Sequence, residues 1–296
     1  MKKKVLASAI ILAMVFTMAA CGEKKSTEPE APANPAAEQT AEPAAEKVTV
    51  NVFAAASLTS VMSEFELLYE AAHENVDIVL NTDSSGALLT QIQEGAPCDI
   101  FFSAAQKQMD TLEEAGMVTA GTRTNVVNNQ LVLITQPDSD TSVKELAEIG
   151  HAKSIALADG SVPVGKYTRQ AMIKLGILKE AEDPAAITTA EVSEQLGGVE
   201  ISEQGNVSKV LAAVEEGSCE VGTTYLSDTV GHEDIVRILQ IVPYDVTGNI
   251  IYPAAQIVNK DADEAETAAA ADFLAFITND AAKEIYEKYG FDTNVE

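Results

Sequence analysis

Apolar runs and helical patterns alternate along the chain from Val48 onward. Runs rich in β-branched residues predict strands, and apolar residues spaced three and four apart predict amphipathic helices. In chain order, the first predicted elements are strand 48–54, helix 58–72, strand 76–80, helix 87–94, strand 99–103 and helix 106–115. This alternation is typical of a parallel sheet that carries helices on both faces.

The same pattern restarts at Gln130. The further predicted elements are strands 130–135, 154–158, 220–224, 235–241 and 250–258, and helices 143–149, 165–175, 207–216, 264–277 and 281–289. Residues 94–100 and 216–221 share one order of features: a helix end, a Gly turn, a Cys, an acidic residue and a strand. We therefore predict an α/β fold of two similar lobes with a hinge and an interlobe cleft. One lobe is 47–129 plus 247–296, the other is 130–246, and crossings near 128–130 and 244–250 form the hinge.

The beginning of the chain is not part of the predicted fold. Residues 1–20 combine three lysines, an apolar run and two alanines before Cys21, which is the layout of a secretory signal peptide. The small residues before Cys21 predict that this cysteine is lipidated, although ordinary secretion with an incidental cysteine also fits. Residues 21–46 are rich in Ala, Pro and Glu and lack large apolar side chains, so we predict a disordered tether behind the lipid anchor.

Charge narrows the choice of partners. The formal net charge is −27, and removal of the three lysines in residues 1–20 takes it to −30 (−27 − 3). Such a surface repels nucleic acid and anionic lipid, so no nucleic-acid partner is expected. It also repels small anions at long range, so an anion site has to be built locally from aimed donors. Cys98 and Cys219 each open an apolar run, which favours free buried thiols over a disulfide.

Small and hydroxyl-bearing residues gather where predicted strands pass into helices. Ligands of open α/β sheets bind at such junctions, and helix N-termini there offer unpaired N–H groups. The candidate donors are Ser57 in the run 54–58, Ser85 in 83–88, the main chain of Val164 in 162–166, the main chain of Val207 in 205–208, and the hydroxyl of Tyr225. Each has a plain alternative as a helix cap, an ordinary loop or a core tyrosine. None is Lys or Arg, so together they predict an anion held by neutral donors.

At these residues the sequence resembles the periplasmic molybdate-binding protein of the ABC transporter family. The matching stretches are Val52-Phe53-Ala54-Ala55-Ala56-Ser57-Leu58, Ser84-Ser85-Gly86 with Leu88 and Gln91-Ile92, Glu94-Gly95-Ala96-Pro97 with Asp99-Ile100-Phe101, Val162-Pro163 with Gly165 and Tyr167, and Tyr289-Gly290-Phe291. The resemblance covers essentially all of 48–292 and implies the type II periplasmic-binding-protein fold.

The resemblance also implies a function. The protein would be an extracytoplasmic, lipid-anchored monomer that binds molybdate or tungstate, uses no other cofactor, and delivers the anion to the membrane permease of an ABC importer. The oxyanion donors carried over from the family are Ser57, Ser85, Val164 (main chain), Val207 (main chain) and Tyr225. Asp83 departs from the pattern, which usually has a small neutral residue there. A carboxylate facing a dianion is costly, so we expect Asp83 to point away from the site.

Other functions are open at this point. The same fold could hold sulfate or another tetrahedral oxyanion, because size selectivity depends on small differences in cleft closure. A ferric-ion site would need clustered Tyr, His and carboxylate ligands, and His73, His151 and His232 all lie in polar settings. No Ser-His-Asp spacing, nucleophile elbow or HExxH motif occurs, so we expect no enzyme. A purely structural lipoprotein would not need junctions lined with donors.

Overall fold

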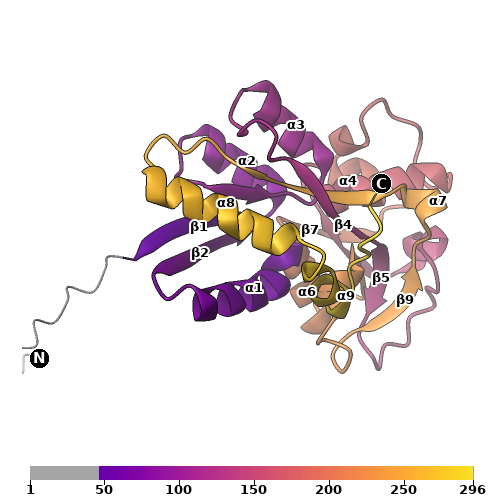
Figure 1. Cartoon of the computed structure of the whole chain (residues 1–296). Helices are drawn as coiled ribbons and strands as arrows, with labels where there is room; N and C mark the ends of the chain where they lie inside the picture. Colours follow the sequence, from indigo (N-terminus) through magenta and orange to yellow (C-terminus); the bar gives the residue numbers. More distant parts are fainter. Residues whose placement is uncertain (1–46, 296) are drawn as a thin grey trace, which may run out of the picture. The chain divides into compact units, whose positions relative to one another are not determined.

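Two five-stranded sheets organise the computed structural model, which describes residues 47–295 (Figure 1). The strand order is β2-β1-β3-β10-β4 in the first sheet and β7-β6-β8-β5-β9 in the second. The strands are β1 Val48–Ala55, β2 Val76–Asp83, β3 Ile100–Phe102, β4 Thr124–Asn129, β5 Leu131–Thr135, β6 Ser154–Ala158, β7 Glu200–Gln204, β8 Val221–Tyr225, β9 Arg237–Ile241 and β10 Ile250–Gln256.

The two sheets share one topology. In the first, β2, β1 and β3 run parallel and β10 joins them antiparallel; in the second, β7, β6 and β8 run parallel and β5 joins them antiparallel. The predicted α/β class with two similar parts is therefore confirmed. The predicted signal peptide, Cys21 and the tether 21–46 lie outside the described residues.

Helices and short 3-10 turns fill the connections. They are η1 Ala56–Leu58, α1 Thr59–Ala72, α2 Ser85–Gln93, α3 Gln106–Glu114, η2 Leu146–His151, α4 Pro163–Lys174, η3 Pro184–Ala186, α5 Thr189–Gln195, α6 Val207–Glu215, η4 Leu226–Thr229, α7 Tyr244–Thr247, α8 Glu264–Thr278 and α9 Ala282–Lys288. In Figure 1, α8 crosses one side of the first sheet while α2 and α3 lie on the other.

Side-chain alternation along β1 explains why both faces of the first sheet are covered. Val52 is fully buried and belongs to the same apolar cluster as Phe65 of α1 and Phe273 of α8. The next residue, Phe53, points to the opposite face and belongs to a separate cluster with Leu88 of α2. From Val52 to Ala55 β1 is buried on both faces and reads as a continuous apolar run, which made the strand recognisable in the sequence.

The chain passes between the sheets at two places. It leaves the first sheet at Asn129, the last residue of β4, and enters β5 of the second sheet at Leu131. It returns between β9 and β10, a stretch that includes the short helix α7. Helices α8 and α9 then follow β10, and α8 packs on β1 and β10 of the first sheet.

Some predicted elements differ from the structure. The predicted helix 143–149 is wrong, because only the 3-10 turn η2 forms, and it begins later, at Leu146. Strands β4 and β7 and helix α5 were not predicted. The segment of β7 is largely exposed and alternates weakly, and β4 carries Asn and Thr at four of its six positions, so neither has the apolar run of a buried strand.

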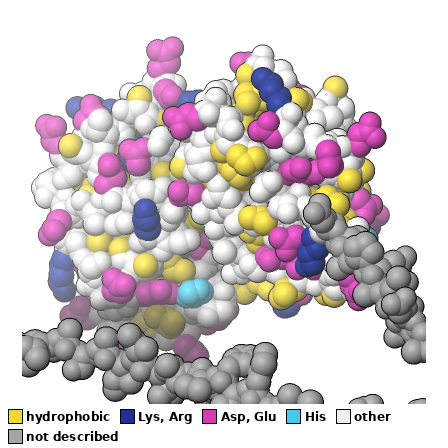
Figure 2. Space-filling model, turned by 90° about the vertical axis from the view of Figure 1, so that its left-hand side faces the viewer, with side chains coloured by type: hydrophobic (Ala, Val, Ile, Leu, Met, Phe, Trp, Pro, Cys, Tyr) yellow, Lys and Arg dark blue, Asp and Glu magenta, His cyan; other side chains and the backbone are white. Residues whose placement is uncertain are grey.

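Acidic side chains outnumber basic ones on the face of the molecule shown in Figure 2. In the view of Figure 2, Asp and Glu are spread over the face while Lys and Arg are few, as the net charge of −27 requires. None of the helices between residues 47 and 295 is long and apolar enough to cross a membrane. Cys98 and Cys219 are buried and free, so the expectation of unpaired thiols is confirmed.

We predict that Gly165→Ala destabilises the fold. A Cβ at Gly165 would lie 2.0 Å from the carbonyl oxygen of Asp159 and 2.5 Å from that of Ala158, so the main chain itself would have to move. The expected loss is about 1–3 kcal/mol in the free energy of unfolding, measured by urea denaturation. Gly205→Ala is the matched control, because its Cβ would meet only the end of the Lys209 side chain at 3.5 Å. Equal stability of the two variants would contradict this account.

Candidate functional site

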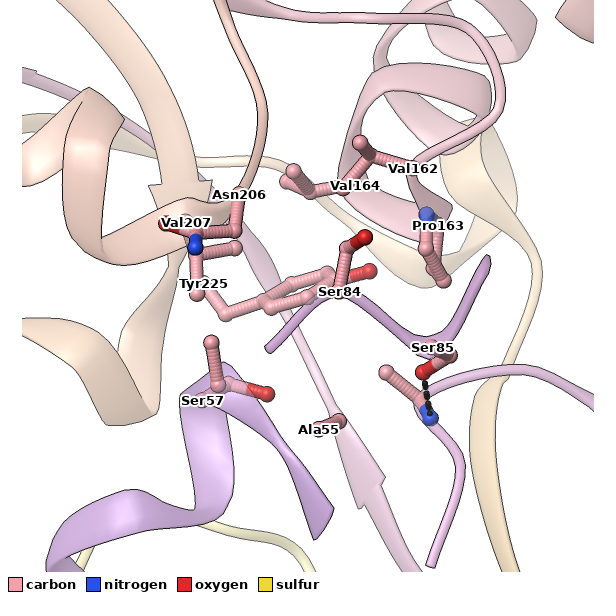
Figure 3. Close-up of a pocket in the computed structure, with 12 residues that line it drawn as sticks. Ala55, Ser57, Ser84, Ser85, Val162, Pro163, Val164, Asn206, Val207 and Tyr225 are labelled. Atoms are coloured by element: carbon pink, nitrogen blue, oxygen red, sulfur yellow. Dashed lines mark hydrogen bonds between the residues drawn. The ribbon is translucent and has the colours of Figure 1, made fainter. Parts of the chain in front are cut away.

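One pocket lies where the parallel strands of both sheets end (Figure 3). Each of the three parallel strands in each sheet is followed by at least one lining residue. The lining residues are Ala55, Ala56 and Ser57 at the end of β1, Ser84 and Ser85 after β2, Ala104 after β3, Val162, Pro163 and Val164 after β6, Asn206 and Val207 after β7, and Tyr225 at the end of β8. The carboxyl ends of strands are where open α/β sheets bind ligands.

All five residues predicted as donors line this single pocket: Ser57, Ser85, Val164, Val207 and Tyr225. Two come from the first sheet and three from the second. The structure therefore brings together residues that are up to 168 positions apart in the chain (225 − 57). Their role as ligands of an anion stays a prediction, because proximity alone does not identify what they bind.

The pocket is small and carries no formal charge. None of its lining residues is Asp, Glu, Lys, Arg or His. Its volume is about 10 Å³, roughly the space that holds one water-sized group. A sugar or an amino acid is therefore too large for the pocket in this conformation, and the geometry favours a compact ligand whose polar atoms meet hydroxyl and main-chain N–H groups.

Three helices begin at the pocket: α2 at Ser85, α4 at Pro163 and α6 at Val207. The first N–H groups of a helix have no intrahelical acceptor, and they form the positive end of the helix dipole. The caps occupy only later positions: Ser84 Oγ accepts from Ala87 N at 3.3 Å, and Asn206 Oδ1 accepts from Lys209 N at 3.0 Å. The N–H groups at the very start of α2 and α6 are therefore left for a ligand.

The hydroxyl groups of Ser85 and Tyr225 are arranged as donors. Ser85 is fully buried and its Oγ accepts a hydrogen bond from Ala104 N at 2.9 Å, the dashed line in Figure 3. Because that bond uses an oxygen lone pair, the Ser85 proton remains for another acceptor. The Tyr225 hydroxyl is buried and has no hydrogen-bond partner among the described residues. Burial raises the pKa of Tyr225 well above its usual value, so this hydroxyl keeps its proton.

Ser57 contacts a residue that sequence reasoning missed. Its Oγ lies 2.9 Å from the hydroxyl oxygen of Tyr252, which also accepts a hydrogen bond from Asn129 Nδ2 at 3.1 Å. Tyr252 lies within the buried strand β10, and Asn129, also missed, ends β4. Nothing local in the sequence distinguishes Tyr252 from an ordinary core tyrosine, and the contact with Ser57 spans 195 positions.

Asp83 is not among the residues that line the pocket, as expected from the cost of facing an anion. Its Oδ1 accepts from the N–H of Ser84 at 2.7 Å and from Asn206 Nδ2 at 3.0 Å. The second of these bonds joins the end of β2 in the first sheet to the cap of α6 beside the second sheet. The carboxylate is therefore committed to two donors that belong to lining residues, Ser84 and Asn206.

A buried carboxyl group holds the strand end that carries Tyr225. Asp228 Oδ2 accepts from Tyr225 N at 2.9 Å and from Thr224 Oγ1 at 2.5 Å. Burial raises the pKa of Asp228 to about 6, against the lowering effect of these two bonds. No local pattern in the sequence marks this residue, because its role depends on the turn η4 folding back onto β8.

The other groups considered from the sequence lie elsewhere. His73 stacks on Tyr69, His232 pairs with Glu215, and none of the three histidines lines the pocket. Within residues 47–295 there is no cluster of three or more His, Cys, Asp or Glu side chains that could hold a metal ion. The pocket thus offers hydrogen-bond donors and small apolar contacts, and the chemistry it suits is reversible binding.

Known proteins resemble the chain over nearly all of its folded part. A family model described as bacterial extracellular solute-binding protein matches residues 50–292. YvgL of Bacillus subtilis, whose name assigns it as a putative ABC transporter substrate-binding lipoprotein, is 30% identical over 246 residues, which is 83% of this chain and 86% of that protein. The molybdate-binding protein ModA of Escherichia coli is 30% identical over 257 residues, which is 83% of this chain and 90% of that protein.

The fold also has solved counterparts. The periplasmic molybdate-binding protein of Azotobacter vinelandii aligns with a TM-score of 0.66 at 22% identity, covering 82% of this chain and 98% of that one. At this level of identity the comparison establishes the shared fold alone.

Proposed function

Because the chain belongs to the bacterial extracellular solute-binding protein family, we propose that it captures molybdate or tungstate between its two sheets and delivers the anion to an ABC importer. The observation that carries this proposal is a neutral, donor-lined pocket in which the Tyr225 hydroxyl is buried without a partner among the described residues. The name of the relative from Escherichia coli supports the choice of anion.

The donor set suits a small dianion. Hydroxyl and N–H groups form short, charge-assisted bonds to anionic oxygens, and such bonds are about twice as strong as neutral ones. The proposed donors are the hydroxyls of Ser57, Ser85 and Tyr225 and the main-chain N–H groups of Val164 and Val207. Fixed dipoles that point at one place also discriminate by size, whereas a mobile ammonium group accepts many anions. The proposed role involves no resident cofactor and no bond-making step.

Binding and closure are coupled in this proposal. Ser57 and Ser85 belong to the first sheet, whereas Val164, Val207 and Tyr225 belong to the second, so one anion satisfies donors from both only when the sheets lie close together. The anion therefore favours the closed conformation by its differential affinity. The closed form would then be the one that docks on the permease.

The location we propose follows from the start of the chain. Residues 1–20 would direct export, Cys21 would carry the lipid, and residues 21–46 would tether the binding domain to the outer face of the cell membrane as a monomer. The lipoprotein name of the Bacillus subtilis relative supports this location. Globomycin treatment of expressing cells, followed by mass spectrometry of the mature N-terminus, would test whether Cys21 is processed and acylated.

We predict that the purified protein binds molybdate and tungstate tightly with one-to-one stoichiometry, and that sulfate and phosphate give no comparable signal. The physical reason is that the convergent donors match one size of fully deprotonated tetrahedral oxyanion. Isothermal titration calorimetry with the four anions under identical conditions provides the measurement. Binding of sulfate alone would keep the oxyanion site and replace the substrate, and silence with all four anions would overturn the proposal.

Removal of single hydroxyls should weaken molybdate binding. We expect Ser57→Ala, Ser85→Ala and Tyr225→Phe each to cost about 1–3 kcal/mol of binding free energy, because each removes a hydrogen bond to a charged oxygen. Ser60→Ala is the control, since Ser60 is exposed and does not line the pocket. Calorimetric titration of each variant, after thermal unfolding has shown that it is folded, measures the effect. Unchanged affinity in both serine variants would refute the site assignment.

A further inference from the structure

A buried chain of hydrogen bonds runs from the crossing between the two sheets to Ser57. Asn129 Nδ2 lies 3.1 Å from the hydroxyl oxygen of Tyr252, and that oxygen lies 2.9 Å from Ser57 Oγ. Asn129 is 1% exposed and Tyr252 is fully buried, so water does not compete for these groups. Neither Asn129 nor Tyr252 lines the pocket, but Tyr252 contacts two residues that do: its hydroxyl meets Ser57, and its ring packs edge-on against Tyr225 with 5.9 Å between the ring centroids.

Counting donors fixes the direction of the first bond in this chain, whereas in the second bond either hydroxyl can be the donor. Asn129 Oδ1 accepts the N–H of Gln130 at 2.9 Å, which assigns the oxygen and nitrogen of the amide. Its nitrogen therefore faces Tyr252 and also donates to Ser227 Oγ at 2.8 Å. An amide nitrogen can only donate, so the Tyr252 oxygen is the acceptor of that bond. Tyr252 has a single proton, and Ser57 Oγ, 2.9 Å from its hydroxyl oxygen, is in position to accept it.

When Tyr252 is the donor, Ser57 is the acceptor in this bond and its own proton is free. Burial keeps the Tyr252 hydroxyl protonated, because it raises the pKa of Tyr252 well above its usual value. In Figure 3 the Ser57 side chain lies at the edge of the pocket together with Tyr225 and Ala55. If Ser57 were the donor of this bond, its proton would point to Tyr252 and only oxygen lone pairs would face an anion.

We propose that Asn129 and Tyr252 are positioning residues that orient the Ser57 hydroxyl as a donor to the bound oxyanion. This inference rests on the proposed function and deepens it, because it explains why the neutral Ser57 hydroxyl donates its proton toward the anion. Asn129 ends β4, where the chain leaves the first sheet, and Tyr252 lies in β10, just after the chain returns to it. The segments that join the two sheets therefore also determine that Ser57 acts as a donor in the pocket.

We call the hydrogen bonds that run from Asn129 through Tyr252 to Ser57 the relay, and the decisive test reverses their direction. Asn129→Asp keeps an oxygen for the N–H of Gln130 but places a second acceptor where Nδ2 was. Tyr252 would then donate to the introduced carboxylate, and Ser57 would donate to Tyr252. We expect molybdate affinity, measured by calorimetry on the full-length protein, to fall about 10-fold to 100-fold, as in Ser57→Ala. Tyr252→Phe removes the hydroxyl that donates to Ser57 and leaves the Ser57 proton free but unoriented, so its loss should be only a few-fold.

The double variant Asn129→Asp/Tyr252→Phe separates a relay from a structural role. Without the Tyr252 hydroxyl, Ser57 has nothing but the anion to donate to, so the double variant should bind molybdate more tightly than Asn129→Asp alone. If the single variants lost molybdate affinity only because of damaged packing, their losses would add up in the double variant. The proposal is overturned if the double variant binds molybdate as weakly as Asn129→Asp or more weakly. Tyr244→Phe is the control at the second crossing: its hydroxyl bonds Asp292 at 3.3 Å, outside the pocket, and its affinity should match wild type.

A second cycle keeps the proposal falsifiable if Asn129→Asp does not fold. Tyr252→Phe should weaken molybdate binding in the wild-type background but leave it unchanged in the Ser57→Ala background, because the effect passes through the Ser57 hydroxyl. An equal loss in both backgrounds overturns the relay. Failure of the proposed function would look different, since the wild-type protein itself would then bind no oxyanion; if it bound sulfate alone, sulfate would serve as the probe.

Discussion

The site depends on hydroxyl protons that the rest of the protein does not use. The lone pair of Ser85 is taken by the N–H of Ala104, and the Tyr225 hydroxyl has no partner among the described residues. A buried donor without an acceptor costs about 1–3 kcal/mol, so the pocket is incomplete until a ligand supplies acceptors. A ligand that supplies acceptors removes this cost, and only one with several acceptors in a small volume can satisfy all the donors together.

The shared topology of the two sheets explains why these donors meet. In each sheet the parallel strands end on one side, and the two sheets turn these ends toward each other, so that every junction contributes to one pocket. Helices α2, α4 and α6 start at the same place and add their unpaired N–H groups. An anion between the sheets therefore acts as the common acceptor of two otherwise separate halves, which links binding to closure more directly than any contact at the surface. The ion pair of Lys107 with Asp183, at 3.5 Å and half exposed, adds little by comparison.

Some strands and site residues could be predicted from the sequence and others could not, and the difference has physical reasons. A strand such as β5 is buried along its whole length and leaves an apolar run, so it was recognised; β7 is mostly exposed and leaves none. Ser57, Ser85 and Val207 were recognised because strand ends and helix starts have local signatures. Tyr252 and Asn129 were not, since their importance lies in contacts across 195 and 123 positions, which no local pattern records.

Asp83 shows how a negative charge is accommodated beside a site for anions. Its carboxylate does not line the pocket and accepts from Ser84 N and from Asn206 Nδ2, so two donors already satisfy it. Asn206 meanwhile caps α6 with its other side-chain atom, which fixes the helix that begins with Val207 against the end of β2. The carboxylate thus holds together the two halves that supply the donors. The wider surface charge of −27 opposes the same anion only at distances where salt screens it, over about 8–10 Å, whereas the donors act at contact. A strongly acidic protein can therefore hold an anion, provided that every acidic group near the site already has a partner of its own.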